Sequence, residues 1–280
     1  MRHAAPDTLT PPPAQKLQRA RGTLRLRLRP GPGGAGPVTL YQSGAAKLFL
    51  PRIHGGVTEV VLVNTAGGLT GGDRFETEIA LDPGARAVVA TQTAERAYRS
   101  PGDMAEVDVT LRLGAGAALD WLAQETILFQ GARLARRITA DLAADARLIL
   151  AEPVVLGRQA MGEDPTDIAF RDRWRIRRDG RLIHAEAQQL GPPLSALRGP
   201  GALGDARAFA TLAAFVPDPE PLADRLAALD PPPGLRAGLG LWADKLILRL
   251  AARDARALRP GLLTYIDALR AGPPPRVWAL

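Results

Sequence analysis

The chain has no cysteine among its 280 residues. This absence excludes disulfides and thiolate metal sites, and it fits the reducing cytosol, where we expect the protein to act. The sequence also has no run of about 18 apolar residues, so we expect no membrane span. Its first 15 residues contain no apolar core segment, and we expect no secretory signal there.

Aromatic residues are scarce, at 5% of the chain, although the net charge is +7. Proteins that bind nucleic acid usually show a basic face interleaved with aromatic side chains. Most of the basic excess lies in residues 1–30, which hold seven Lys or Arg residues and one Asp. We therefore expect no nucleic-acid partner. The basic segment is either an arm that meets an acidic protein surface or a solvated edge strand that resists unwanted pairing.

The remaining sequence predicts a mainly β fold. Residues 1–20 are predicted to be a mobile basic tail, and residues 21–280 a single β-rich domain, because apolar and polar residues alternate with period two in many segments. No helical period appears before about residue 220. Helices are predicted near 219–230, with Asp218 as a candidate cap, and near 254–272. The coarse picture is a β-body with a small C-terminal helical part.

The β-body repeats itself at intervals of 32 and 29 residues. The stretches LDPGARAVV (81–89), LGAGAALDW (113–121) and LAADARLIL (142–150) share a leading Leu, a turn residue fourth and an Ala fifth. A period of about 30 residues in strand–turn–strand units indicates a solenoid of stacked coils. Such stacking would align Gln92 with Gln124 in a polar row beside Glu125 and Glu152. The alternative is a chance match of short strings in a biased composition.

Four glycines, Gly67, Gly68, Gly71 and Gly72, directly precede Asp73 in AGGLTGGD. This is no phosphate-binding loop, because no Lys-Ser or Lys-Thr follows and the next residues alternate like a strand. The glycines predict a tight turn with positive φ angles. Asp73 then either caps turn amides or has a functional role.

Candidate catalytic groups are few. The sequence has no GxSxG and no HExxH, and its three histidines are scattered. The carboxylates of the β-body remain: Asp73, Glu125, Glu152, Glu163, Asp164 and Glu186. Each could be the ion-pair partner of a nearby arginine. Together they could instead bind a borderline cation weakly, which suits transient passage better than storage.

The ordered set GGLTGGD, TQTAERAYRS, LDWLAQETILFQGA, EPVVLGRQAMGE and FRDRWRIRRDGRLIHAE resembles the urease accessory protein UreD family, also called UreH. The resemblance runs from about residue 22 to 280. Departures occur at Glu95, Arg96 and Ala123, and in the stretch 238–245, where the family's serine is missing.

The resemblance implies a urease maturation chaperone that is not an enzyme. Family members form a complex with UreF and the GTPase UreG, dock on urease apoprotein and deliver nickel as UreG hydrolyses GTP. The implied fold is β-helix-like with helices at one end. The implied nickel path would pass near Asp73 and Glu186, and we add Glu125 and Glu152 as candidates. Nickel would be in transit, with no tightly bound cofactor.

The second predicted helix carries an apolar stripe. We expect the predicted helices at 219–230 and 254–272, with the C-terminal Trp278, to form much of the surface for UreF; the alternative is that this stripe packs on the sheet. The residues of this stripe are Leu258, Leu262, Tyr265, Ile266 and Leu269.

Two other functions remain open. One is a β-helical enzyme that acts on glycans with a carboxylate pair, which would need an open groove lined by aromatic side chains. The other is a pure protein scaffold with no metal path.

Overall fold

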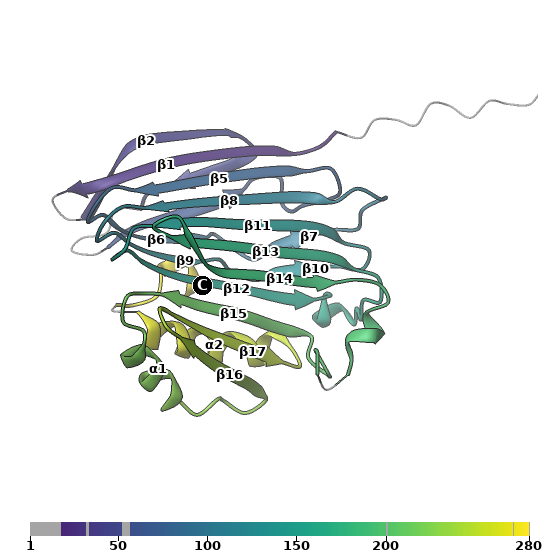
Figure 1. Ribbon diagram of the computed structural model, residues 1–280. Helices are drawn as coiled ribbons and strands as arrows, with labels where there is room; N and C mark the ends of the chain where they lie inside the picture. Colours follow the sequence, from purple (N-terminus) through teal and green to yellow (C-terminus); the bar gives the residue numbers. More distant parts are fainter. Residues whose placement is uncertain (1–17, 32–33, 52–56, 200, 271, 280) are drawn as a thin grey trace, which may run out of the picture.

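Two stacked β-sheets form the body of the protein (Figure 1). The computed structural model describes residues 18–31, 34–51, 57–199, 201–270 and 272–279. The predicted tail therefore lies outside the described residues, except for residues 18–20.

The first sheet has seven strands in the order β14-β13-β11-β8-β5-β1-β2. Their bounds are β1 (Arg21–Gly31), β2 (Gly34–Gly44), β5 (Arg74–Leu81), β8 (Ala105–Leu113), β11 (Arg133–Leu142), β13 (Ala169–Arg178) and β14 (Arg181–Leu190). β1 is not the basic edge strand that the sequence suggested, because β2 folds back and pairs along its outer side.

The second sheet has ten strands, with β16-β17-β15-β12-β9-β6-β4-β3 in order and the short β7 and β10 to one side. Their bounds are β3 (Ala46–Phe49), β4 (Thr58–Asn64), β6 (Arg86–Thr91), β7 (Glu95–Ala97), β9 (Ala118–Leu122), β10 (Thr126–Leu128), β12 (Arg147–Leu156), β15 (Ala208–Phe215), β16 (Leu235–Trp242) and β17 (Lys245–Ala252).

The predicted repeat is confirmed as a stack of coils. β5, β8 and β11 are parallel neighbours in the first sheet, and β6, β9 and β12 are parallel neighbours in the second. The register places Leu113 between Leu81 and Leu142. In each coil the chain turns sharply where it passes from one sheet to the other. Gly84 and Gly116 lie at these turns with φ angles of 74° and 64°, values that favour glycine.

A helical layer covers the outer face of the second sheet at its antiparallel end (Figure 1). It consists of α1 (Glu220–Ala227) and α2 (Ala255–Leu269), and three 3₁₀ turns lie elsewhere, at Gln159–Met161, Leu194–Leu197 and Arg276–Trp278. Asp254 caps α2 by accepting a hydrogen bond from the Ala257 amide at 2.8 Å. The expected Asp218 cap of α1 is wrong, because the helix begins after Pro219 with no side-chain cap.

The protein has two apolar cores. The larger core lies between the two sheets and includes Leu28, Ile79 and Trp174, and the second lies between the ten-stranded sheet and the helices. Inward-facing residues alternate with outward-facing ones along the strands of the first sheet, as the period-two pattern predicts.

Candidate functional site

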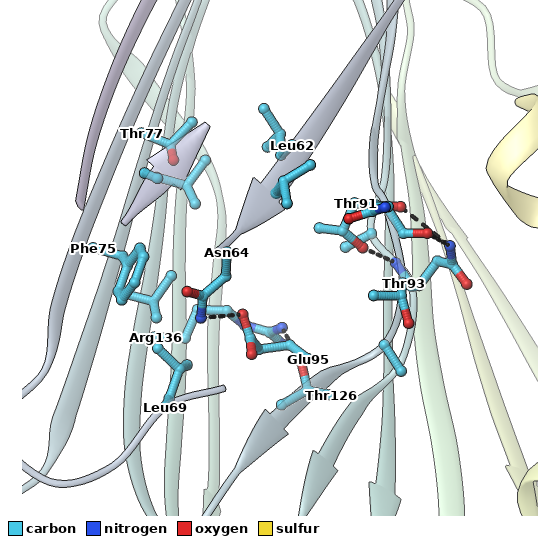
Figure 2. Close-up of a pocket in the computed structure, with 18 of the residues that line it drawn as sticks. Leu62, Asn64, Leu69, Phe75, Thr77, Thr91, Thr93, Glu95, Thr126 and Arg136 are labelled. Atoms are coloured by element: carbon cyan, nitrogen blue, oxygen red, sulfur yellow. Dashed lines mark hydrogen bonds between the residues drawn. The ribbon is translucent and has the colours of Figure 1, made fainter. Parts of the chain in front are cut away.

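A cavity of about 160 Å³ opens between the two sheets, beside the short strands β7 and β10 (Figure 2). Apolar side chains such as Leu62, Leu69 and Phe75 form part of its wall. Polar side chains form the rest: Asn64, Thr77, Thr91, Gln92, Thr93, Glu95, Arg96, Gln124, Thr126, Arg136 and Glu152. A polar hollow inside a β-body is costly unless its groups are paired, so these pairings define the chemistry of the site.

Glu152 and Arg136 are the central buried pair of this site. Glu152 projects from β12, accepts a hydrogen bond from the Trp121 indole at 2.7 Å and contacts the Arg136 guanidinium. Arg136 projects inward from β11 and also binds Asp172 of β13, with an Nη2–Oδ2 distance of 2.6 Å. Two buried carboxylates thus share one buried arginine, and the cluster carries one excess negative charge when all three groups are ionised.

Burial raises the pKa of Glu152 to about 7, because removal from water disfavours its charged form. Arg136 opposes this shift, and the neighbouring Asp172 adds to it by like-charge repulsion. Burial alone would lower the pKa of Arg136, but Asp172 and Glu152 together raise it, so the arginine stays charged. A pKa of about 7 means that Glu152 takes up and releases a proton near neutral pH.

Glu95 is a second acid at the cavity wall. Its Oε2 accepts a hydrogen bond from the Asn64 amide at 3.1 Å, as Figure 2 shows, and its Oε1 accepts one from the Arg96 amide at 3.0 Å. Burial raises its pKa, and these two hydrogen bonds act in the opposite direction. This position was noted from the sequence only as a departure from the family pattern.

The glycine loop is the tight turn that the sequence predicted. Gly67, Gly68 and Gly72 have φ angles of 78°, 151° and 89°. Gly71 is needed for space instead, because a Cβ there would lie 1.9 Å from the Ser100 hydroxyl oxygen. The loop fixes the position of the residue that follows it, Asp73.

Asp73 is held by backbone amides. Its Oδ1 accepts a hydrogen bond from the Ala20 amide at 2.7 Å and its Oδ2 accepts one from the Thr70 amide at 2.8 Å. The side chain is 4% exposed. The structure thus gives Asp73 the turn-capping role, and it places this carboxylate at a different hollow from the inner cavity.

The other two carboxylates of the expected nickel path, Glu125 and Glu186, each have an arginine partner of their own. Glu125 binds Arg259 of α2, with an Nη1–Oε1 distance of 2.9 Å. Glu186 lies within β14 and contacts Arg249 of β17, and its Oε2 is 3.8 Å from His184 Nε2. The four candidates are therefore not gathered into one ligand set. In the described part of the chain, no three His, Cys, Asp or Glu side chains come together as a metal site.

The apolar stripe of α2 is packed against the sheet, which is the alternative that the sequence left open. Its residues are at most 2% exposed: Leu258, Leu262, Tyr265, Ile266, Leu269 and, beyond the helix, Trp278. They form the second core with β12, β15 and β17. The expectation that these side chains present a surface to UreF is therefore wrong for the folded chain, because its own sheet covers them.

Two members of the central cluster were missed from the sequence. The alternation in RLARRITADL places one of its two adjacent arginines inside, and the alternation in FRDRWRI places Asp172 inside between Phe170 and Trp174. Arg136 and Asp172 are also direct cross-strand partners, 36 residues apart, in the register of the coils. The period-two pattern combined with the repeat could have found both.

No helix in the described residues is long and apolar enough to cross a membrane.

The model of the UreD urease accessory protein family matches residues 20–279. The urease accessory protein UreD of Chelativorans sp. (strain BNC1) is 43% identical over 283 residues, covering 100% of both chains. The UreD proteins of Rhizobium rhizogenes (strain K84 / ATCC BAA-868) and Paracoccus denitrificans (strain Pd 1222) are 46% and 44% identical, covering 94% of this chain and 96% and 93% of their own. With this match along nearly its whole length, the chain belongs to the UreD urease accessory protein family.

Proposed function

We propose that this chain is a non-enzymatic chaperone of urease maturation that helps insert nickel into the urease apoprotein. Family membership supports the role in urease maturation. In our proposal it acts in the cytoplasm, in a complex with UreF and the GTPase UreG. Nickel is its cargo, and GTP is used by the partner.

The observation that carries the nickel proposal is the polar cavity between the sheets, whose lining includes two glutamates and two arginines. Glu95 and Glu152 line it, and Asp172 lies behind Arg136. An excess of buried carboxylate favours entry of a divalent cation, and oxygen ligands with no thiols hold nickel weakly enough for release. Because Glu152 exchanges its proton near neutral pH, an arriving cation would displace that proton.

The other candidate carboxylates have a smaller part in this proposal. Asp73 is occupied by two backbone amides, and Glu125 and Glu186 are occupied by arginines. A path that used them would require each of these contacts to open. Glu152 is likewise paired with Arg136, but Glu152 and Glu95 line the cavity and the other three carboxylates do not, so we propose these two as the principal groups.

The glycan-enzyme alternative is not favoured by the outer groove of the described residues, although Phe75 and Trp121 line the inner cavity. The hollow that contains Asp73, Asp103 and Glu106 has no aromatic side chain in its lining, and a sugar platform needs one. A scaffold with no metal path differs from our proposal only in the role of the cavity, so a test of the cavity separates the two.

The test measures urease activity in cells that express the whole urease cluster with Glu152→Gln or Glu95→Gln. Each substitution keeps the shape of the side chain and replaces an ionisable carboxylate of the cavity by a neutral amide. We expect activation to fall by roughly tenfold, the low end of what the loss of a group near a metal costs. Recovery of UreF and UreG with the tagged chain should be unchanged.

The matched control is Glu76→Gln, the same substitution on β5 with the side chain facing outward. It should activate urease like the parent chain. If both cavity variants also activate like the parent, the nickel role of the cavity is wrong and the scaffold alternative replaces it.

A further inference from the structure

A row of three arginines, Arg171, Arg173 and Arg175, runs along the outer face of β13 and is called the arginine row here. All three side chains are exposed, because the residues between them face the core. β13 lies between β11 and β14 in the seven-stranded sheet, as Figure 1 shows. Alternate residues of a strand are about 6.8 Å apart, so the row presents evenly spaced positive charges on a fixed scaffold.

The arginine row is not neutralised by its own protein. Within the described residues, no carboxylate lies within ion-pair distance of any of its three members. The neighbouring arginines on the same face are different, since Arg137 binds Asp108 at 2.5 Å and Arg74 binds Glu106 at 2.5 Å. The acidic groups of β8 are thus already occupied, and the row is left with unbalanced charge.

The row also borders a groove of about 520 Å³. Arg171 and Arg173 form one side of this groove together with Arg137 of β11, which is the direct cross-strand neighbour of Arg173. Arg74 and Met104 lie among the other lining residues. The face therefore offers a hollow in which Arg171 and Arg173 have no carboxylate partner among the described residues, and each can bind one in a forked geometry.

We propose that the arginine row and its groove bind an extended, acidic segment of a partner protein. Carboxylates at alternate positions of an extended chain repeat at the same spacing of about 6.8 Å as the arginines, so successive ion pairs form without bending either chain. The arginine row lies on the outer face of the seven-stranded sheet, and the proposal does not rest on nickel, although Arg136 lines both the groove and the inner cavity.

Two other anionic partners fit this face less well. Single-stranded nucleic acid is bound through aromatic platforms as well as cations, and no aromatic side chain lines the groove. An anionic membrane is a continuous negative surface, and it would meet Glu106 and Asp103 at the same groove. A protein segment can place its carboxylates opposite the arginines and leave those two acids facing solvent.

The test uses the full chain and fluorescent heptapeptides at low salt. One peptide alternates aspartate with threonine, and a second has the same composition with the aspartates in one block. We expect the alternating peptide to bind more tightly than the block peptide and to be released by sodium chloride. The triple variant Arg171→Gln, Arg173→Gln, Arg175→Gln should bind it about tenfold more weakly, since each exposed ion pair contributes a factor of roughly two to five.

The matched control is Arg86→Gln, Arg147→Gln, Arg256→Gln, which removes the same charge from exposed arginines elsewhere. It should bind like the parent chain. If the triple variant melts lower than this control, the single substitutions Arg171→Gln and Arg173→Gln provide the same comparison. Equal weakening in both triple variants, or no peptide binding by the parent, overturns the proposal. Tighter binding of oligothymidine or of phosphatidylserine vesicles than of the alternating peptide overturns it as well.

Discussion

Asp73 shows how one carboxylate can be fully engaged by the backbone. Both of its oxygens accept hydrogen bonds from amides, one from the preceding loop and one from Ala20, 53 residues earlier. The glycine turn brings Thr70 and Asp73 into this arrangement. A negative charge at this position thus joins the start of β1 to the loop before β5.

We predict that Asp73→Asn destabilises the protein by about 1–3 kcal/mol, although asparagine has the same size. The amide NH₂ group must face one of the two backbone N–H groups, which leaves a buried donor without an acceptor. Urea unfolding of the purified chain measures this loss. Asp103→Asn is the control, since Asp103 is exposed, and it should change the free energy of unfolding by less than about 0.5 kcal/mol. Equal stability of the two variants would remove Asp73 from the capping role.

At the scale of elements, the C-terminal segment is part of the fold. Trp278 is 2% exposed, and its indole donates a hydrogen bond to the Leu122 carbonyl at 3.1 Å. The Arg259 guanidinium lies over its ring at 4.9 Å and also binds Glu125. Gln124 binds the Val277 carbonyl at 3.1 Å. The segment after α2 therefore connects the helical layer to the loop between β9 and β10.

We predict that Trp278→Ala lowers the free energy of unfolding by about 3–5 kcal/mol, the usual cost of emptying a buried aromatic site. Guanidinium unfolding followed by circular dichroism measures it. Trp242→Ala provides the matched control, because Trp242 is 55% exposed on the edge strand β16, and its loss should be smaller than about 1 kcal/mol. A loss at Trp278 no larger than at Trp242 would contradict the structural role of the C-terminal segment.

The strands also show which parts of the fold the sequence predicts. The coils could be predicted, because parallel stacking places Leu113 beside Leu81 and Leu142, and each coil repeats the same turn. The place of β1 inside its sheet could not, since it depends on long-range pairing with β2 and β5. In the candidate site, Glu152 was identified from the sequence as an acidic residue beside the polar row of the repeat. Its partner Arg136 was missed, because which of two adjacent arginines turns inward depends on the register of the strand.

At the scale of the whole molecule, β12 connects two halves of different construction. On one side it pairs in parallel with β9 and so ends the stack of coils, and on the other it pairs with β15 and starts the antiparallel, helix-covered end. Glu152 lies in this strand, 3% exposed, in contact with Arg136 of the opposite sheet. Its ionisation is therefore coupled to the integrity of both sheets, and it should be visible in the stability of the entire chain.

We predict that Glu152 makes the protein less stable as pH rises. Its pKa is about 7 in the folded chain and 4.5 as the ordinary value, so the folded state binds the proton more tightly. The stabilisation by this proton is complete below pH 4.5 and is lost as pH rises through 7, by about 3 kcal/mol in total. Glu152→Gln cannot lose a proton, and it leaves Arg136 paired with Asp172 as a neutral couple.

The measurement is the free energy of unfolding of both proteins between pH 4.5 and pH 8. The difference, variant minus parent, should increase with pH by about 3 kcal/mol, because only the parent must bury a second negative charge at pH 8. Glu76→Gln, on the outer face of β5, should follow the parent at every pH. A constant difference between Glu152→Gln and the parent would mean that Glu152 is ionised throughout this range. The excess charge of the cluster would then be permanent, and an arriving cation would have no proton to displace.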